Sequence, residues 1–188
     1  TSVNVQNSGK VSFSFCDMES ENSLSPYNTD NVSLKNCSLD MASIRLNGVD
    51  NFNLTGNSME GTTLELGSFD HCRIWKNSFN GGGIFFLGRL DNFDDVDIPT
   101  NNTLNGLPIL YKCNTDYMNT TIGDGYGQII LGNVSNLILS EIDMDGIIHP
   151  LILSYCNFVR MEDLDIRKAQ TGLRIQHCNN IKIINSTF

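Results

Sequence analysis

A pattern of polar and apolar residues recurs along the chain at intervals near 21 residues, and this spacing constrains the fold more than any other feature. Each copy opens at an anchor residue, and successive anchors are 20, 20, 21, 44, 21 and 23 residues apart. The interval of 44 equals two periods, so we expect one degenerate repeat between Leu104 and Asp124. Repeats of this length indicate a solenoid, in which each repeat packs on its neighbours. The anchors are Asn31, Asn51, His71, Asn92, Asn136, Asn157 and Asn180.

Apolar residues alternate with polar ones after each anchor, as in Val32 and Leu34 or Phe52 and Leu54. This period of two is typical of a β-strand with one face in the core. A second apolar column stands eight residues past the anchor, and another apolar strand precedes each anchor. Each period therefore predicts two or three short strands separated by Asn, Gly or Asp turns.

The composition agrees with β-structure, because the chain has 24 Asn and only two Ala. Asn favours turns and left-handed backbone positions, whereas Ala is the strongest helix former. A hydrophobic content of 40% is sufficient for a core. The net charge of −9, with 12 Lys and Arg, argues against nucleic-acid binding, which needs clustered basic residues. No apolar run reaches about 18 residues, so no membrane span is expected.

These patterns favour an all-β, right-handed, single-stranded parallel β-helix of about eight coils, with ~21 residues per coil, as one domain over residues 1–188. A leucine-rich repeat would need its consensus leucine spacing, and a sandwich would not keep one register through seven phrases. Residues 91–128 depart from the repeat and predict an irregular coil and loop. Stacked amides at one turn are expected to form an asparagine ladder. Its predicted members are Asn31, Asn51, Asn92, Asn136, Asn157 and Asn180, with Asn57 and Asn77 in a separate inner column.

The stretch NNTLNGLPILYKC, followed by GQIILGNVSNLILSEIDM, resembles the parallel β-helix repeat family. The resemblance is to its nitrous-oxide-reductase accessory (NosD-like) type, found in archaeal and bacterial surface proteins, and covers Asn31 to Phe188 best. It implies an extracytoplasmic solenoid linked to cell-surface structure or polysaccharide. It does not imply one reaction, because this fold hosts many functions.

The candidate catalytic residues are Asp94, Asp95 and Asp97, which cluster in the irregular coil. Paired carboxylates perform glycoside hydrolysis, and lyases of this fold commonly combine calcium with a basic residue, for which Arg160 is the candidate. Asp95 is expected at a position that an inward Leu fills in other coils, and Trp75 is a candidate sugar platform. The competing interpretation is a solvated acidic face, because no further catalytic signature accompanies the cluster.

The six cysteines fall at or near apolar repeat positions, which favours free thiols in the core. Cys16 and Cys37 are 21 residues apart and Cys156 and Cys178 are 22 apart, so bridges between neighbouring coils are the alternative. No metal or other cofactor is expected of a non-catalytic protein, whereas a lyase of this fold would use calcium. The chain has no CxxC motif for zinc, and the methionines that could hold copper are explained as core residues. These methionines are Met18, Met59 and Met144.

Four N-x-S/T sequons are the better candidates for glycosylation if the protein is extracellular: Asn53, Asn101, Asn119 and Asn133. The repeat continues to Phe188 without a capping helix. An uncapped coil exposes unpaired backbone groups, so we expect self-association through coil ends or contact with neighbouring domains of the same chain.

The first hypothesis for function is a non-catalytic structural or adhesive β-helix of the cell surface, able to stack end to end into a sheath or surface layer. The second is a polysaccharide lyase or glycoside hydrolase domain that acts on surface polysaccharide. Polysaccharide is a candidate partner under both hypotheses, and nucleic acid is a partner under neither hypothesis.

Overall fold

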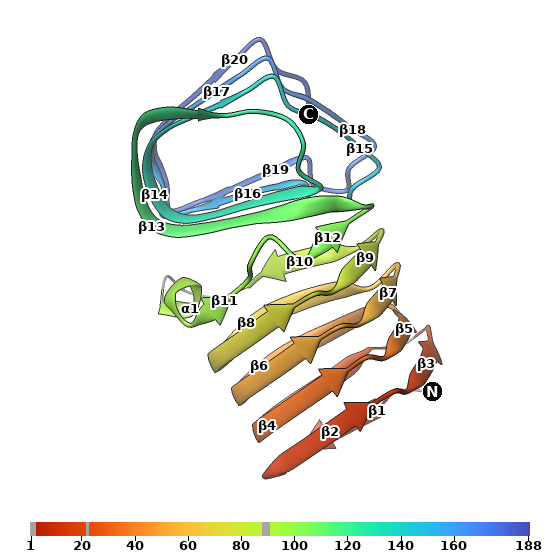
Figure 1. The fold of residues 1–188 in the computed structure, drawn as a ribbon. Helices are drawn as coiled ribbons and strands as arrows, with labels where there is room; N and C mark the ends of the chain where they lie inside the picture. The colour runs from red at the N-terminus through yellow and green to blue at the C-terminus, as the bar shows by residue number, and fades with distance from the viewer. Residues whose placement is uncertain (1–2, 22, 88–90) are drawn as a thin grey trace. The chain divides into compact units, whose positions relative to one another are not determined.

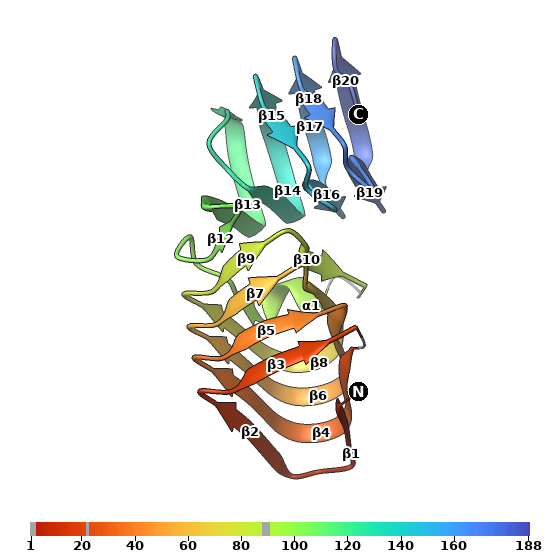
Figure 2. The ribbon, with the colours of Figure 1, turned by 90° about the vertical axis from the view of Figure 1, so that its right-hand side faces the viewer.

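In the computed structural model, which describes residues 3–21, 23–87 and 91–188, the chain forms an all-β parallel solenoid of about nine turns with about 20 residues per turn. This confirms the predicted fold class, with one turn more than the eight that we expected. The chain divides into two compact units, Thr1–Gly106 and Leu107–Phe188, each described here by itself. The division falls inside the predicted irregular segment 91–128, and the assignment of one domain to residues 1–188 stays a prediction. Within each unit, the strands of successive turns run parallel to one another (Figure 1 and Figure 2).

The first unit consists of short strands joined by tight turns, with one helical turn inserted late in the unit (Figure 1). Three long strands, each bent at a corner, alternate with strands of three or four residues. In chain order the elements are β1 (Val3–Gln6), β2 (Lys10–Ser14), β3 (Asp17–Ser20), β4 (Leu24–Lys35), β5 (Ser38–Met41), β6 (Ser43–Thr55), β7 (Ser58–Glu60), β8 (Thr63–Trp75), β9 (Ser78–Asn80), β10 (Gly83–Phe86), α1 (Asp91–Asp94), β11 (Val96–Asp97) and β12 (Thr103–Leu104).

Apolar side chains of the first unit stack in columns, because β4, β6 and β8 pair in parallel and in register. Val32 lies beside Phe52, and Phe52 lies beside Cys72; all three are buried. The predicted column eight residues past the anchor is also present, with Leu39, Met59 and Phe79 at most 1% exposed. Burial of each such side chain stabilises the coil by about 1.5–3 kcal/mol.

A ladder of buried amides lies inside the first unit at the turn that follows the long strands. The backbone N–H of Asn57 donates to Asn77 Oδ1 at 3.0 Å, and the backbone N–H of Asn77 donates to Asn102 Oδ1 at 3.1 Å. Each side-chain NH2 reaches the strand of an earlier coil, as in Asn77 Nδ2 to the Leu54 carbonyl at 2.8 Å. The inner column expected at Asn57 and Asn77 is therefore the buried asparagine ladder, and it extends to Asn102.

Helix α1 breaks the period of the repeat. Val96, not Phe93, pairs with Cys72, so this coil contains extra residues before its strand. Phe93 is 1% exposed and stacks on Phe86 with ring centroids 4.4 Å apart. Two expectations are corrected: Asn92 lies in α1 and not at the anchor position, and Asp95 is exposed while Val96 faces the core.

The second unit contains the expected degenerate repeat, which is a single long strand of 16 residues with a register irregularity between Asp116 and Thr120. The later coils are regular, and Leu137 pairs with Val159, which pairs with Ile181. In chain order the strands are β13 (Leu107–Ile122), β14 (Gln128–Ser140), β15 (Asp143–Asp145), β16 (Leu151–Ser154), β17 (Asn157–Glu162), β18 (Asp165–Arg167), β19 (Leu173–Gln176) and β20 (Asn179–Ile184).

One anchor of the second unit is displaced by a residue from the prediction. Because Ser135 pairs with Asn157 and Leu137 with Val159, Asn136 is level with Phe158, not with Asn157. All three residues at the true anchor position, Asn136, Phe158 and Asn180, have left-handed backbones with φ of 53°, 52° and 53°. Phe158 consequently points outward and is 56% exposed, although its hydrophobicity suggested an inward position.

Candidate functional site

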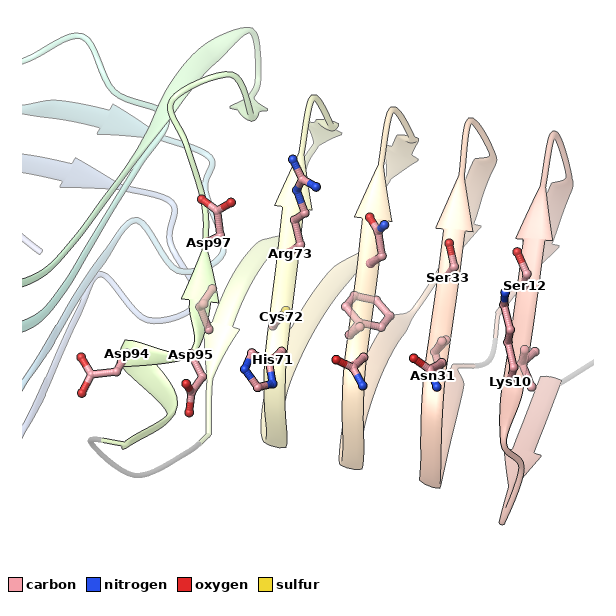
Figure 3. A pocket seen from close by; sticks show the side chains of 16 residues that line it. Lys10, Ser12, Asn31, Ser33, His71, Cys72, Arg73, Asp94, Asp95 and Asp97 are labelled. Atoms are coloured by element: carbon pink, nitrogen blue, oxygen red, sulfur yellow. The ribbon is translucent and has the colours of Figure 1, made fainter.

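A groove with a volume of about 760 Å³ runs across β2, β4, β6, β8 and β11 of the first unit (Figure 3). The pairing register aligns two rows of polar side chains along it, separated by a row of apolar side chains that belongs to the core. The first row is Lys10, Asn31, Asn51, His71 and Asp95, and the second row is Ser12, Ser33, Asn53, Arg73 and Asp97.

The alternation of each strand explains why this face is polar. Residues at positions i and i+2 of a strand lie on the same face, and in-register pairing brings equivalent residues of neighbouring coils about 4.8 Å apart. Asn31 and Asn51 are register partners, and Asn51 and His71 are the next pair. Two of the residues that we predicted as a ladder, Asn31 and Asn51, therefore line the groove. Their amides are exposed and make only long contacts, from Asn31 Nδ2 to the Gly9 carbonyl and from Asn51 Nδ2 to the Asp30 carbonyl, both at 3.3 Å.

A cluster of Arg73, Trp75 and Asp97 lies at the β11 end of the groove. The guanidinium carbon of Arg73 is 3.9 Å from the centroid of the Trp75 ring, a cation–π contact that limits the rotamers of the arginine. The Trp75 indole Nε1–H donates to Asp97 Oδ2 at 2.7 Å. Trp75 therefore holds a basic and an acidic side chain on the two neighbouring strands, where Arg73 and Asp97 are register partners. Trp75 was predicted from the sequence as a sugar platform, whereas Arg73 was not predicted, although the spacing of two residues in RIW places both on one face.

The three predicted acidic residues are brought together at this same end. Asp94, Asp95 and Asp97 all line the groove and are exposed, with His71 beside them on β8 (Figure 3). Arg160 is not part of the groove lining, because it lies on β17 of the second unit and donates from Nε to Glu162 at 2.8 Å. The basic residue that accompanies the acidic group is Arg73.

The groove is polarised along its length, with Lys10 at one end and three aspartates at the other. Its side chains between these ends are mainly amides and hydroxyls, which can donate and accept hydrogen bonds at once. Such a lining suits a ligand rich in hydroxyl groups and of mixed or low charge. A polyanion would meet the carboxylates of the β11 end.

Cys72 lies beneath the groove and offers no nucleophile to it. Its side chain faces the core between His71 and Arg73, is 3% exposed, and burial raises the pKa of its thiol far above the usual range. Within the described part of the chain, no group of three or more His, Cys, Asp or Glu side chains is arranged to hold a metal ion. Across the same residues, no helix has the length and apolar character needed to cross a bilayer.

The four glycosylation candidates are all exposed, and the side chains of three of them make defined hydrogen bonds. Asn53 is in the groove, where Thr55 Oγ1 contacts its Oδ1 at 2.5 Å, so a glycan there would occupy the groove. Asn101 Oδ1 accepts from the Lys76 N–H at 3.0 Å. Asn133 Nδ2 donates to Asn114 Oδ1 at 2.7 Å. Asn119 and Asn133 both have left-handed backbones, within β13 and β14 of the second unit.

Comparison with protein families, with curated proteins and with solved structures gives no match to this chain. The resemblance to the NosD-like type therefore stays a prediction.

Proposed function

We propose that this chain is a non-catalytic adhesive or structural β-solenoid of the cell surface that binds an extended polysaccharide along the groove. The observation that carries the proposal is the pair of polar rows repeated on five successive parallel strands. Because each strand adds one residue to each row, the groove repeats its hydrogen-bonding groups about every 4.8 Å. A linear polymer with repeating hydroxyl groups matches that arrangement better than a compact ligand does.

The cluster of Arg73, Trp75 and Asp97 supplies the most ordered contact of the groove. Stacking on Trp75 reduces the rotamer entropy that the Arg73 guanidinium loses when a ligand binds, and the hydrogen bond to Trp75 does the same for Asp97. Arginine and aspartate side chains together can hold adjacent hydroxyl groups of one sugar through two donors and two acceptors. We expect this cluster to contribute most of the affinity.

Binding is tested by titration calorimetry of the protein against a panel of neutral, amino-substituted and uronate polysaccharides. Arg73→Ala should weaken binding at least tenfold, because an ordered, charge-assisted hydrogen bond contributes about 1.5–3 kcal/mol. Lys182→Ala is the matched control, because Lys182 is an exposed basic residue on β20 of the other unit and should leave affinity unchanged. Equal affinities for the two variants, or no binding to any polymer of the panel at millimolar concentration, would refute the proposal.

A polysaccharide lyase or hydrolase is the second candidate, and one observation favours it. Asp95 and Asp97 are both exposed and line the same end of the groove. Most glycoside hydrolases act through a pair of carboxyl groups that flank the scissile bond. Release of new reducing ends or unsaturated products, abolished by Asp95→Asn, would establish catalysis and replace the non-catalytic proposal.

Self-association through coil ends is the remaining part of the proposal. In the last coil of the second unit, β19 pairs with β16 and β20 pairs with β17, while Ile175 and Ile183 are 40% and 45% exposed. A further parallel coil, from a second copy or from a neighbouring domain, would cover these side chains and extend the ladders. Light scattering over a range of protein concentrations tests this, and a monomer at every concentration would contradict association between copies. An extracellular location, with glycans on the exposed sequons, belongs to the same proposal.

A further inference from the structure

Two cysteines of the second unit, Cys156 and Cys178, lie side by side on neighbouring coils, each directly before a strand. The residues that follow them, Asn157 and Asn179, are register partners in the parallel pair of β17 and β20. Parallel strands are about 4.8 Å apart, which lies inside the range of Cα separations that a disulfide spans. The backbone N–H of Cys156 donates to Cys178 Sγ at 3.2 Å, so the sulfur of one coil already faces the other cysteine.

We propose that Cys156 and Cys178 form a thiol–disulfide exchange site, which small-molecule disulfides convert into a covalent staple between two coils of the solenoid. This inference is independent of the groove, which lies in the other unit.

The surroundings give the two thiols different roles. Cys178 is half-buried, whereas Cys156 is fully buried, so a reagent reaches Cys178 first. Hydrogen bonds from Cys156, first from its thiol and then from its backbone N–H, lower the pKa of Cys178 to about 7, although partial burial opposes the shift. The same thiol–thiol hydrogen bond, together with burial, raises the pKa of Cys156. Cys178 is therefore the attacking thiolate, and Cys156 is the resolving thiol.

The turn around the pair also holds the two cysteines in place. The residues that precede them, Tyr155 and His177, both have left-handed backbones and stack with ring centroids 4.8 Å apart. The Tyr155 N–H donates to the Gln176 carbonyl at 2.8 Å. Because adjacent turn residues are fixed by this stack and this hydrogen bond, the cysteines approach each other without a large backbone rearrangement.

The reaction proceeds in two exchange steps. The Cys178 thiolate attacks one sulfur of a small disulfide, breaks its S–S bond and releases one thiolate. The Cys156 thiol then loses its proton to solvent and attacks the Cys178 sulfur, which releases the second thiolate. The two protein sulfurs are oxidised to one disulfide, and the small disulfide is reduced to two thiols.

The test uses the full chain, reduced and then treated with oxidised glutathione at neutral pH, quenched with acid and analysed by peptide mass spectrometry. The expected product is a cross-linked peptide pair that contains Cys156 and Cys178. In Cys156→Ser, the mixed disulfide with glutathione should accumulate on Cys178, because the resolving thiol is absent. In Cys178→Ser, glutathione should be incorporated at Cys156 at least tenfold more slowly than it is at Cys178 in the Cys156→Ser variant.

The chain supplies two internal controls. Cys72 is 3% exposed in the core and should stay unmodified in the folded protein. Cys16 is half-buried, as Cys178 is, and precedes a strand in the same way, but among the described residues no backbone N–H is seen to donate to its sulfur as that of Cys156 does to Cys178. Alkylation of Cys178 should be roughly tenfold faster than that of Cys16 at neutral pH. Equal rates, or the absence of the Cys156–Cys178 peptide pair while Cys178 is modified, would overturn the proposal.

Formation of the bridge should also change the dynamics of the second unit. The bridge closes a loop of 22 residues that contains β17, β18 and β19. Because the closed loop lowers the entropy of the opened chain, these strands should open roughly a hundredfold less readily. Amide hydrogen exchange of Val159 and Met161, compared between the reduced and oxidised protein, measures that change. An unchanged exchange rate in a protein shown to carry the bridge would contradict the staple.

Discussion

Asn77 offers the sharpest test of what holds the first unit together, because its amide is the central member of the buried ladder. Its side chain is 2% exposed and participates in four hydrogen bonds with other residues. Asn77 Oδ1 accepts from the backbone N–H and the side-chain NH2 of Asn57, both at 3.0 Å. Asn77 Nδ2 donates to the Leu54 carbonyl at 2.8 Å and to Asn102 Oδ1 at 3.0 Å.

Asn77→Ala should lower the free energy of unfolding by about 4 kcal/mol. This figure adds the cost of leaving two buried groups without a hydrogen-bond partner to the cost of the cavity left by the side chain. The side-chain NH2 of Asn57 keeps its bond to the Leu34 carbonyl, and Asn102 Oδ1 keeps its bond from the Asn77 backbone. The buried N–H of Asn57 and the carbonyl of Leu54 each lose a partner, at a cost of about 1–3 kcal/mol apiece.

The assay is urea unfolding followed by the fluorescence of Trp75, the single tryptophan of the chain, which lies in the same unit as the ladder. With a slope of about 2 kcal/mol per M, the midpoint should fall by about 2 M. Asn51→Ala is the control, because Asn51 has an exposed amide with one hydrogen bond of 3.3 Å and should change stability by less than about 0.5 kcal/mol. If the two variants unfold at the same urea concentration with the same slope, the ladder does not stabilise the fold and the reasoning fails.

Three further predictions follow from single contacts. Gly82→Ala should destabilise the protein by several kcal/mol more than Gly61→Ala in the same urea assay. Both glycines have positive φ, 72° and 61°, but only a Cβ at position 82 would overlap the Thr62 carbonyl. Trp75→Leu should weaken polysaccharide binding as much as Arg73→Ala, because it releases Arg73 and Asp97 from their positions; calorimetry that shows unchanged affinity would contradict this. Hydrogen bonds from the Met118 N–H and from Asn136 lower the pKa of Asp116 below its ordinary value of about 3.9. Both bonds should therefore persist at pH values above that ordinary pKa and should be lost as the pH falls through the lowered pKa, which NMR titration of the Met118 amide tests.

Much of the fold could be predicted because a solenoid repeats one set of constraints. Period-two alternation and a spacing near 21 residues identified Val32, Phe52 and Cys72 as one column, and the structure places these residues in register and buried. The same spacing identified the column of Asn57 and Asn77. In each case the equivalence of positions was local, and no tertiary information beyond stacking was needed.

The errors have two physical causes. Insertion of α1 lengthens one coil, so a count of 21 residues from His71 leads to Asn92, while the pairing leads to Asp95. Phe158 itself has a left-handed backbone within β17, and the inward position is taken by Val159, which is why the apolar Phe158 points to solvent. Neither a short insertion nor a single positive φ changes the alternation pattern enough to be seen in the sequence.

The candidate site could be predicted only in part, because the sequence indicated an inner column at Asn57 but assigned Asn31 and Asn51 to a stacked ladder and not to a groove. Asn31 and Asn57 repeat with the same period, yet Asn31 is exposed in the groove and Asn57 is buried in the ladder. The acidic residues were identified as a group. Their basic neighbour was not, because Arg73 and Asp97 become register partners only through strand pairing across a coil of irregular length.

A solenoid of this kind assigns stability and binding to different sets of side chains on the same strands. Inward residues such as Asn77 and Leu54 determine whether the coils stack, while outward residues such as Asn51 and Arg73 have few packing partners and can change with little effect on folding. Asn51 and Leu54 lie on opposite faces of β6, and Asn77 lies four residues after Arg73 at the turn that follows β8, so replacements only a few residues apart should separate the two properties. Asn77→Ala should lower the urea midpoint and retain the affinity of the molecules that remain folded, whereas Arg73→Ala should retain the midpoint and lose affinity. If Arg73→Ala instead lowers the midpoint by as much as Asn77→Ala, the groove is part of the structural framework and the assignment of its side chains to a ligand is wrong.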